Sequence, residues 1–302
     1  MNFRELSYVI AISKHQSVGG AAKELGISQP TLSKFVQHIE SEIGQPLFKK
    51  LGNKFLLTPA GDIFEKKARV LLSIKHELDF ELEDLLDETV GVLKIAFPIM
   101  RGTYMLPCTL PVFAKRFPRV RLTVQEANSA RLEDMIVNGE IDIAFFTLPI
   151  RNTDVTYTVI NEEEIVLVMS ANHCLAKQGV SRSDCKYPWI DIAKLSEESF
   201  LVQRPDQRTR QITDRLFREA KIEPHIILEA RNIHATVQLA CEGYGMAFVS
   251  ETHLKHVRND RQIACFSIGK PCTTTSFVAA HRSGVYLPKY AKEYVRIVKE
   301  FT

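Results

Sequence analysis

A short stretch between residues 28 and 37 carries polar side chains whose types and spacing suit contacts with nucleic acid. Gln29, Thr31, Ser33, Lys34 and Gln37 share one face of a helical repeat, and the apolar residues between them form the opposite face. Amide and ammonium groups of this reach bond to base edges, whereas hydroxyl groups bond to phosphate or sugar. The set therefore predicts direct contact with a DNA groove.

Two short helices must position this face. Apolar residues recur at helical spacing through Val18–Leu25, and Gly26 follows, the residue best able to take the left-handed conformation that ends a helix. Ser28 is a good cap for the next helix. Pro30 lies in the first turn of that helix, where a backbone N–H has no partner within the helix, so its missing N–H loses no hydrogen bond. A second apolar stripe continues to Ile43. The pattern predicts a helix-turn-helix supported by an earlier helix over residues 2–14.

A small hairpin is predicted directly after these helices. The run from Pro46 to Lys50 leads into a Gly52-Asn53 turn, and an apolar strand follows before Thr58 caps another helix. Lysines at the rim of such a wing suit phosphate contacts. The DNA-binding candidates are therefore Gln29, Pro30, Thr31, Ser33, Lys34 and Gln37 on the helix, and Lys50, Asn53 and Lys54 on the wing.

The stretch AAKELGISQPTLSKFVQHIESEIGQPLFKK, followed by LTPAG, resembles the DNA-binding region of LysR-type transcriptional regulators. Gly19-Gly20 departs from that family pattern, which has better helix formers there. Lys34 stands where arginine is more frequent, and lysine donates as a point charge rather than as a planar fork. The resemblance implies a sequence-specific transcriptional regulator that binds a double-stranded DNA operator and contacts RNA polymerase, with no enzymatic activity and no cofactor.

A single long helix is predicted from Thr58 to about Thr89, because apolar residues recur in steps of three and four. Its apolar stripe is narrow, so it needs a partner surface. Packing on the chain's own C-terminal domain is one solution. Pairing with the same helix of a second subunit is favoured by the resemblance, which implies a homodimer or homotetramer.

Beyond residue 90 the pattern changes to alternating strands and helices. Strands at 92–97, 120–124 and 141–146 with intervening helices, the first expected around 103–117, predict a parallel sheet with right-handed crossovers. A second such unit starts with a strand expected at Glu164–Ser170. This unit and a returning segment resemble the two-lobed effector domain of the family, which is similar to periplasmic binding proteins. The expected fold class is α plus α/β. The expected domains are a winged helix-turn-helix at 1–58, a linker helix at 59–89 and an effector domain at 90–302, with lobe one at 91–160 and 267–302 and lobe two at 161–266.

Ligands of such sheets bind beyond the carboxyl ends of the strands, where helix starts offer free N–H groups. The resemblance implies a small, anionic metabolite as effector. Arg101 and Arg204 fit an anion, although a salt bridge at the surface or between the lobes explains them equally well. Ser129 and Asn232 are also readable as simple helix caps. The effector-binding candidates are Ile99, Met100, Arg101, Gly102, Thr103, Asn128, Ser129, Thr147, Gln203, Arg204, Arg208 and Asn232.

Other functional classes find little support in the sequence. The start of the chain lacks the apolar core of a signal peptide and no apolar run spans a membrane, so a cytoplasmic protein is expected. The net charge of +3 is divided into +3 over residues 1–58, −5 over 59–90 and +5 over 91–302, which leaves the predicted DNA-binding region modestly basic.

Catalytic and metal motifs are also missing. No phosphate loop, GxSxG or HExxH motif is present, and His253 and His256 have no third ligand in the sequence nearby, so no metal site is expected. The six cysteines form no CxxC pair and are expected to be free thiols. A redox-sensing regulator that uses cysteines, a cytoplasmic solute-binding protein and an enzyme on the two-lobed scaffold stand as alternatives.

Overall fold

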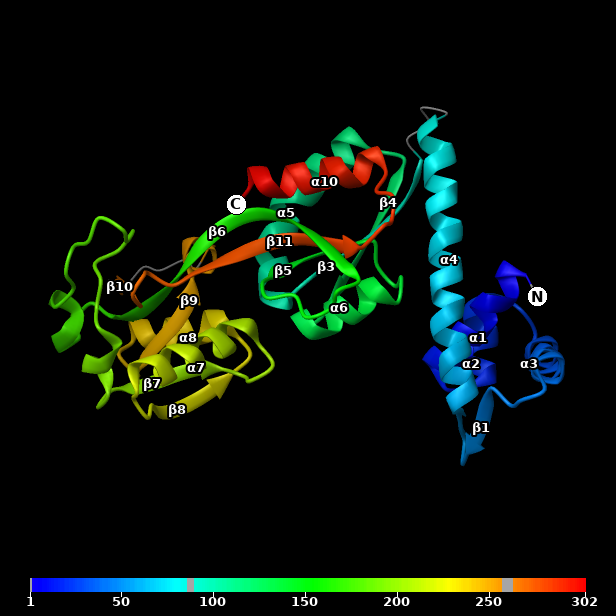
Figure 1. Cartoon of the computed structure of the whole chain (residues 1–302), viewed down its shortest axis with the longest axis horizontal. Helices are drawn as coiled ribbons and strands as arrows, with labels where there is room; N and C mark the ends of the chain where they lie inside the picture. The colour runs from blue at the N-terminus through cyan, green and yellow to red at the C-terminus, as the bar shows by residue number, and fades with distance from the viewer. Residues whose placement is uncertain (1, 86–89, 257–262) are drawn as a thin grey trace. The chain divides into compact units, whose positions relative to one another are not determined.

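The computed structural model describes residues 2–85, 90–256 and 263–302 (Figure 1). Its described part forms two compact units, one built on residues 1–88 and one built on residues 89–302. Among the described residues, no helix combines the length and the apolar character that a membrane crossing requires.

The first unit begins with three helices, α1 (Phe3–His15), α2 (Val18–Leu25) and α3 (Gln29–Ile43). Gly26 ends α2 with a φ of +66°, and its N–H donates to the last carbonyls of that helix. The Ser28 hydroxyl accepts the N–H of Thr31 at 3.3 Å and so caps α3, while Pro30 occupies its first turn. These local signals confirm the predicted helix-turn-helix.

The wing consists of β1 (Phe48–Leu51) and β2 (Lys54–Leu57), which pair antiparallel around a turn at Gly52. Glu40 of α3 fixes the start of this hairpin, because one of its carboxylate oxygens accepts the N–H groups of Leu47 and Phe48 at 2.7 and 2.9 Å. A side chain at Gly61 would lie 2.0 Å from the carbonyl oxygen of Leu47, so only glycine permits this close packing.

The linker helix α4 (Pro59–Leu85) starts where it was expected, with the Thr58 hydroxyl accepting the N–H of Gly61 at 3.0 Å. The last residues of the predicted helix, 86–89, lie outside the described residues. The apolar stripe of α4 is exposed within this chain. Its exposed members are Leu71, Ile74, Leu78 and Leu82.

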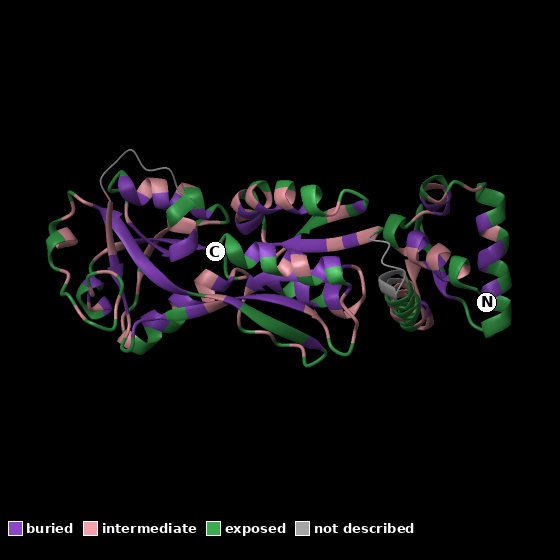
Figure 2. Cartoon of the chain, turned by 90° about the horizontal axis from the view of Figure 1, so that it is seen from above, coloured by how far each residue is buried: buried purple, intermediate pink, exposed green. Residues whose placement is uncertain are grey.

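The second unit contains the two-lobed α/β fold that the sequence predicts, and its central strands are largely buried (Figure 2). In lobe one, the parallel strands are β3 (Gly91–Phe97), β4 (Val120–Glu126) and β5 (Ile143–Thr147). The helices of this lobe are α5 (Ile99–Arg116), α6 (Ser129–Val137) and α10 (Lys289–Glu300). The start of α5 was expected near residue 103, so it begins one turn earlier than predicted.

Lobe two repeats the arrangement. Its strands are β7 (Ser199–Gln203), β8 (His225–Ala230), β9 (Met246–Ser250) and β10 (Ile263–Ser267), of which β7 lies between β8 and β9 and runs parallel to both. The helices are α7 (Arg208–Ala220), α8 (Ile233–Cys241) and α9 (Glu251–His256), with 3₁₀ turns at Cys174–Lys177 and Ile192–Leu195.

Two strand paths connect the lobes. The long strand β6 (Val155–Ser170) pairs with β11 (Thr274–Arg282) through its first half and with β9 and β10 through its second half. A strand was predicted only from Glu164 onward, and that prediction was too short. The first half of β6 contains Val155, Tyr157, Val159 and Ile160, which are residues typical of strands, so its signal was present in the sequence and was missed.

The expectation that all six cysteines are free thiols is wrong. Cys185 and Cys272 form a disulfide, with their Cα atoms 6.0 Å apart. The other four cysteines are not in disulfide bonds. The bonded pair is separated by 87 residues in the chain and is brought together by the turn between β10 and β11, so sequence spacing gave no sign of it.

Candidate functional site

The polar face of α3 is open to solvent. Of the six helix residues predicted to contact DNA, Ser33 is half-buried and the other five are exposed. The hydrophobic core of the first unit holds this face rigidly, because Leu32, Phe35 and Val36 of the same helix are buried. The Thr31 hydroxyl lies 2.7 Å from that of the capping residue Ser28, so it is engaged within the helix start.

The three wing residues predicted to contact DNA are also exposed. Lys50 faces Phe55 across the two strands, and Asn53 and Lys54 lie at the tip of the hairpin. The structure thus presents donors on α3 and cations on the wing, both held by one core. A helix with base-reaching side chains beside a basic hairpin is the arrangement of a winged helix-turn-helix.

The second unit contains a cavity of about 300 Å³ between its two lobes. A cavity of this volume has room for one small metabolite. Eight of the twelve predicted effector residues line the cavity: Ile99, Met100, Arg101, Asn128, Ser129, Thr147, Arg208 and Asn232.

Four helix starts converge on this cavity. The first residues of α5 and α6 line it from lobe one, and the first residues of α7 and α8 line it from lobe two. Asn128 caps α6 by accepting the N–H of Arg131 at 2.9 Å, and Asn232 caps α8 by accepting the N–H of Ala235 at 3.2 Å. The prediction that Ser129 caps a helix is therefore wrong: Ser129 is the first residue of α6 and is buried.

The other two helix starts have no side-chain cap. Pro98 precedes α5 and Gln207 precedes α7, and neither side chain accepts a hydrogen bond from its helix. The first N–H groups of a helix have no partner within the helix and carry the positive end of its dipole. The cavity therefore offers hydrogen-bond donors and a positive potential to a ligand.

Arg101 forms a buried ion pair with Glu163 of β6, with Nη2 2.5 Å from Oε1. The guanidinium also lies 4.1 Å from the ring centre of Phe277. Burial opposes charge on both partners, but their mutual attraction is stronger, so the pKa of Arg101 is raised and the pKa of Glu163 is lowered. Arg101 is thus a charged residue of the cavity wall that already has a carboxylate partner.

Arg208 forms the second buried ion pair, and this pair joins the lobes. Its Nη2 donates to Oε1 of Glu133 on α6 at 2.8 Å. The other oxygen of Glu133 accepts the N–H groups of Arg151 and Asn152 at 2.8 and 3.2 Å. The Nε–H of Arg208 is buried and has no hydrogen-bond partner among the described residues. It is a free donor on a residue that lines the cavity.

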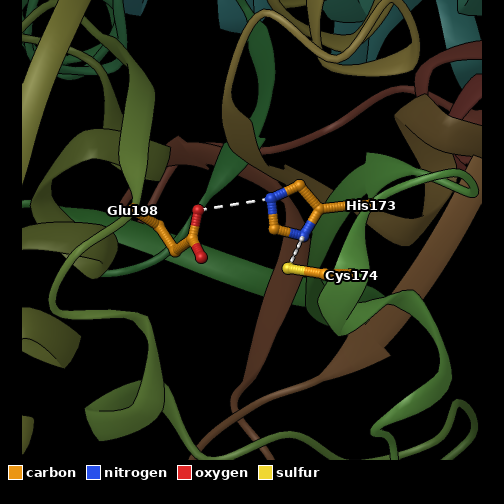
Figure 3. A group of neighbouring side chains, drawn as sticks. All are labelled: His173, Cys174 and Glu198. Atoms are coloured by element: carbon orange, nitrogen blue, oxygen red, sulfur yellow. Dashed lines mark hydrogen bonds and ion pairs between the residues drawn. The ribbon is translucent and has the colours of Figure 1, made fainter.

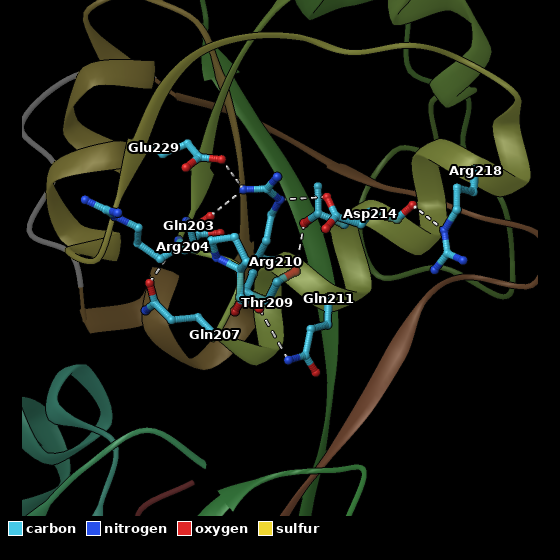
Figure 4. Close-up of polar contacts among 11 residues, drawn as sticks. Gln203, Arg204, Gln207, Thr209, Arg210, Gln211, Asp214, Arg218 and Glu229 are labelled. Atoms are coloured by element: carbon cyan, nitrogen blue, oxygen red, sulfur yellow. Dashed lines mark hydrogen bonds and ion pairs between the residues drawn. The ribbon is translucent and has the colours of Figure 1, made fainter. Parts of the chain in front are cut away.

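A network of polar contacts holds the turn before α7 (Figure 4). Arg210 donates through Nη1 to the carbonyl oxygen of Gln203 at 3.0 Å and to Glu229 at 2.6 Å, and through Nε to Asp214 at 2.6 Å. In Figure 4 the side chain of Arg204 extends away from Arg210 and Asp214. The network fixes the start of α7, and two of its members, Gln207 and Thr209, also line the cavity.

Four predicted effector residues do not line the cavity. Gln203 is buried and donates to the Thr236 hydroxyl at 3.3 Å, and Arg204 is exposed outside the lining. Gly102 is buried within the first turn of α5, and the Thr103 hydroxyl donates to the carbonyl oxygen of Ile99 at 3.0 Å. Gly102 and Thr103 directly follow the lining residue Arg101, whereas Gln203 and Arg204 precede the lining stretch that begins at Asp206.

Sequence reasoning missed eight lining residues, most of which neighbour predicted ones. His253 of α9 is the exception, because nothing in its sequence context points to the cavity. Burial and the charge of Arg101 lower the pKa of His253 to about 3, so its imidazole is neutral at physiological pH. Its Nδ1 lies 2.7 Å from the Ser250 hydroxyl. The missed residues are Pro98, Ala127, Asp206, Gln207, Thr209, Arg231, Ile233 and His253.

Two family models match the chain. The model described as "Bacterial regulatory helix-turn-helix protein, lysR family" matches residues 3–62, and the model described as "LysR substrate binding domain" matches residues 86–302. The HTH-type transcriptional regulator CbbR of Rhodospirillum rubrum is 25% identical over 299 residues, which cover 99% of this chain and 96% of CbbR. BsdA of Bacillus subtilis is 27% identical over 303 residues, covering 98% of this chain and 99% of BsdA.

Solved structures share the fold over the full length. A full-length variant of OxyR from Pseudomonas aeruginosa has a TM-score of 0.75 at 21% identity, covering 100% of this chain and 94% of that one. Full-length CbnR, solved in complex with its target DNA, has a TM-score of 0.61 at 22% identity. The match covers 100% of this chain and 100% of CbnR. The matches favour a regulator over the alternatives of a solute-binding protein or an enzyme.

Proposed function

The chain belongs to the LysR family of transcriptional regulators, and on this premise we propose which of its residues contact DNA and which contact the effector. Members of the family bind operator DNA and small-molecule effectors. A regulator of bacterial genes works where the chromosome is, so we place the protein in the cytoplasm, with RNA polymerase as a partner at the promoter.

For DNA, we propose that α3 enters the major groove. Gln29, Lys34 and Gln37 would reach base edges, whereas Thr31, Ser33 and Pro30 would touch phosphate, sugar or a thymine methyl. Lys50, Asn53 and Lys54 of the wing would contact the flanking phosphates. The observation that supports this assignment is the solvent-open polar face of α3, whose opposite face is buried in the core.

The exposed stripe of α4 supports self-association. Leu71, Ile74, Leu78 and Leu82 are each at least 40% exposed within this chain, and a second copy of α4 offers a matching apolar surface. We propose a dimer formed through this helix and a tetramer formed from two dimers. Paired recognition helices then fit a DNA site with two-fold symmetry.

For the effector, we propose a small ligand with an anionic or acceptor-rich end and an apolar body, bound in the cavity between the lobes. The observation that carries this proposal is the convergence of four helix starts, two of them without a side-chain cap, on the cavity that Arg208 also lines. The ion pairs of Arg101 and Arg208 within the wall limit the ligand to a low charge, because Glu163 and Glu133 already balance both cations. Ile99, Met100 and Ile233 supply the apolar contacts.

A thermal-shift screen of the full chain with monocarboxylates and dicarboxylates of metabolite size tests this proposal. A ligand present at 100 times its dissociation constant stabilises the folded state by about 2.7 kcal/mol. For a unit of this size the melting temperature then rises by roughly 5–10 °C. Ser129→Ala should weaken the shift, whereas Arg204→Ala, outside the lining, should leave it unchanged. Equal loss in both variants would contradict the placement of the ligand.

The DNA proposal has its own test. Operator sequences selected from random duplexes by the wild-type protein are titrated with wild type and with Ser33→Glu in fluorescence anisotropy. We expect the added charge on the DNA-facing side of α3 to abolish specific binding, while the circular dichroism melting curve stays unchanged. Unchanged operator affinity would show that α3 does not enter the groove.

A further inference from the structure

Three side chains at the end of β6 form a cluster that plays no part in the cavity or in DNA contact. They are His173, Cys174 and Glu198, and Figure 3 shows the imidazole ring between the thiol and the carboxylate. The Sγ of Cys174 lies 3.8 Å from Nδ1 of His173. The Nε2 of the same ring lies 3.2 Å from a carboxylate oxygen of Glu198. The order thiol, imidazole, carboxylate is that of an activated nucleophile.

Hydrogen bonding fixes which ring nitrogen carries the proton. The N–H of Leu175 donates to Nδ1 of His173 at 3.2 Å, so Nδ1 is an acceptor and presents its lone pair. The proton of the neutral ring therefore resides on Nε2, where it is donated to Glu198. The lone pair of Nδ1 is thus on the side where the thiol of Cys174 lies, and the carboxylate stabilises the imidazolium that forms when the thiol gives up its proton.

Accessibility distinguishes Cys174 from the other cysteines. Of the four cysteines outside the disulfide it is the exposed one, whereas Cys241 is buried and Cys108 and Cys265 are half-buried. Burial also raises the pKa of Cys265 to about 11, which keeps that thiol protonated and unreactive. An attacking reagent in solution therefore meets Cys174 first.

A metal ion is a second explanation of the same three donors, whose ligand atoms lie within 4.8 Å of one another. A metal must lie on the lone pair of the imidazole nitrogen that binds it. Here the thiol and the carboxylate are at different nitrogens of the ring (Figure 3), so a metal ion on either nitrogen would lie beside only one of them. The geometry favours proton transfer over metal ligation.

We propose that Cys174 is a nucleophilic thiol that exchanges with small disulfides, with His173 as its base and Glu198 as the residue that positions the imidazole. Cys174 transfers its proton to Nδ1 of His173, and the thiolate attacks one sulfur of the external disulfide. A bond forms between Sγ and that sulfur while the original S–S bond breaks. Its electron pair leaves with the second sulfur, which takes the proton from the imidazolium. The products are a mixed disulfide on Cys174 and one small thiol.

The experiment uses the full-length protein with an aromatic disulfide reagent, 5,5′-dithiobis(2-nitrobenzoate), and follows thiolate release by absorbance at neutral pH. We expect one fast phase in the wild type that is absent in Cys174→Ser. In His173→Asn the fast phase should slow by roughly tenfold or more, because the base is lost. Asparagine is a good helix cap and keeps the acceptor for the Leu175 N–H, so the local fold is retained.

Glu198→Gln should slow the same phase by a few-fold, since the amide still accepts from Nε2 but carries no charge to stabilise the imidazolium. Imidazole added to the buffer should restore part of the rate in His173→Asn, a recovery that a purely structural role would not produce. The neutral reagent iodoacetamide, followed by peptide mapping, controls for the negative charge of the disulfide reagent. It should label Cys174 before the other cysteines.

Two results would overturn the proposal. One is a rate at Cys174 in the folded wild type that is no faster than in the urea-unfolded chain, or a rate that His173→Asn leaves unchanged. The other is complete protection of Cys174 by equimolar Zn²⁺ that is lost in Glu198→Gln, because that would assign the cluster to a metal ion.

Discussion

The buried ion pair between Arg208 and Glu133 should be one of the strongest single contacts between the lobes, and Glu133→Ala tests this. The substitution leaves the guanidinium of Arg208 buried without its carboxylate, which typically costs about 3–5 kcal/mol. It also removes the acceptor of two backbone N–H groups. Each N–H that is left unsatisfied lowers the stability by about 1–3 kcal/mol when no water replaces the carboxylate. The adjoining cavity admits water to Arg208, so we expect a net loss of about 3 kcal/mol.

Urea unfolding followed by the fluorescence of Trp189, the single tryptophan, reports on the second unit. The matched control is Glu219→Ala on α7, which breaks an exposed pair with Arg215 whose atoms are 3.7 Å apart. Exposed pairs contribute about 0–0.5 kcal/mol, so this control should change the midpoint little.

A double substitution separates the pair from either residue alone. Glu133→Ala combined with Arg208→Met removes both charges, and the loss should then be smaller than in Glu133→Ala alone, because no uncompensated charge stays buried. If Glu133→Ala shifts the midpoint no more than Glu219→Ala does, the pair does not hold the lobes and the reasoning fails.

Three further predictions concern other parts of the chain. Burial raises the pKa of Asp142 to about 6, so the folded chain loses stability as pH rises from ~4 to ~6. In urea titrations, Asp142→Asn should raise the free energy of unfolding by about 1–3 kcal/mol at pH ~7.5 and leave it unchanged at pH ~4. Equal effects at the two pH values would refute this prediction. Cys185→Ser should lower stability by about 2–4 kcal/mol and abolish any effect of reductant on the midpoint, measured beside wild type. Lys50→Ala should reduce the salt slope of operator binding by about 1 in anisotropy titrations, and an unchanged slope would exclude a phosphate contact.

The DNA-binding head was predictable because its signals are local. Gly26, Ser28 and Pro30 each determine the backbone within one turn of themselves, and the structure shows the expected left-handed residue, cap and first-turn proline. The chemistry of each residue is sufficient there, since no distant segment has to supply a partner. The same holds for Asn232, whose side chain caps α8 as the sequence suggested.

The cavity was predictable only in part, for a physical reason. Helix starts after strands are local features, and they located eight lining residues. What these residues do there depends on distant partners: Glu163 is 62 residues from Arg101, and Glu133 is 75 residues from Arg208. His253 reaches the cavity from a third segment.

The position of β11 at the centre of its sheet has a consequence for synthesis of the protein. This strand lies between β5 and β6, and α10 after it contributes the buried rings of Tyr290 and Tyr294, so lobe one requires the last residues of the chain. The core of the DNA-binding head, in contrast, draws only on residues 8–64. A ribosome therefore releases a complete DNA-binding head long before lobe one can close. A message truncated before residue 274 would encode a chain that keeps the exposed polar face of α3 but lacks the complete sheet of lobe one.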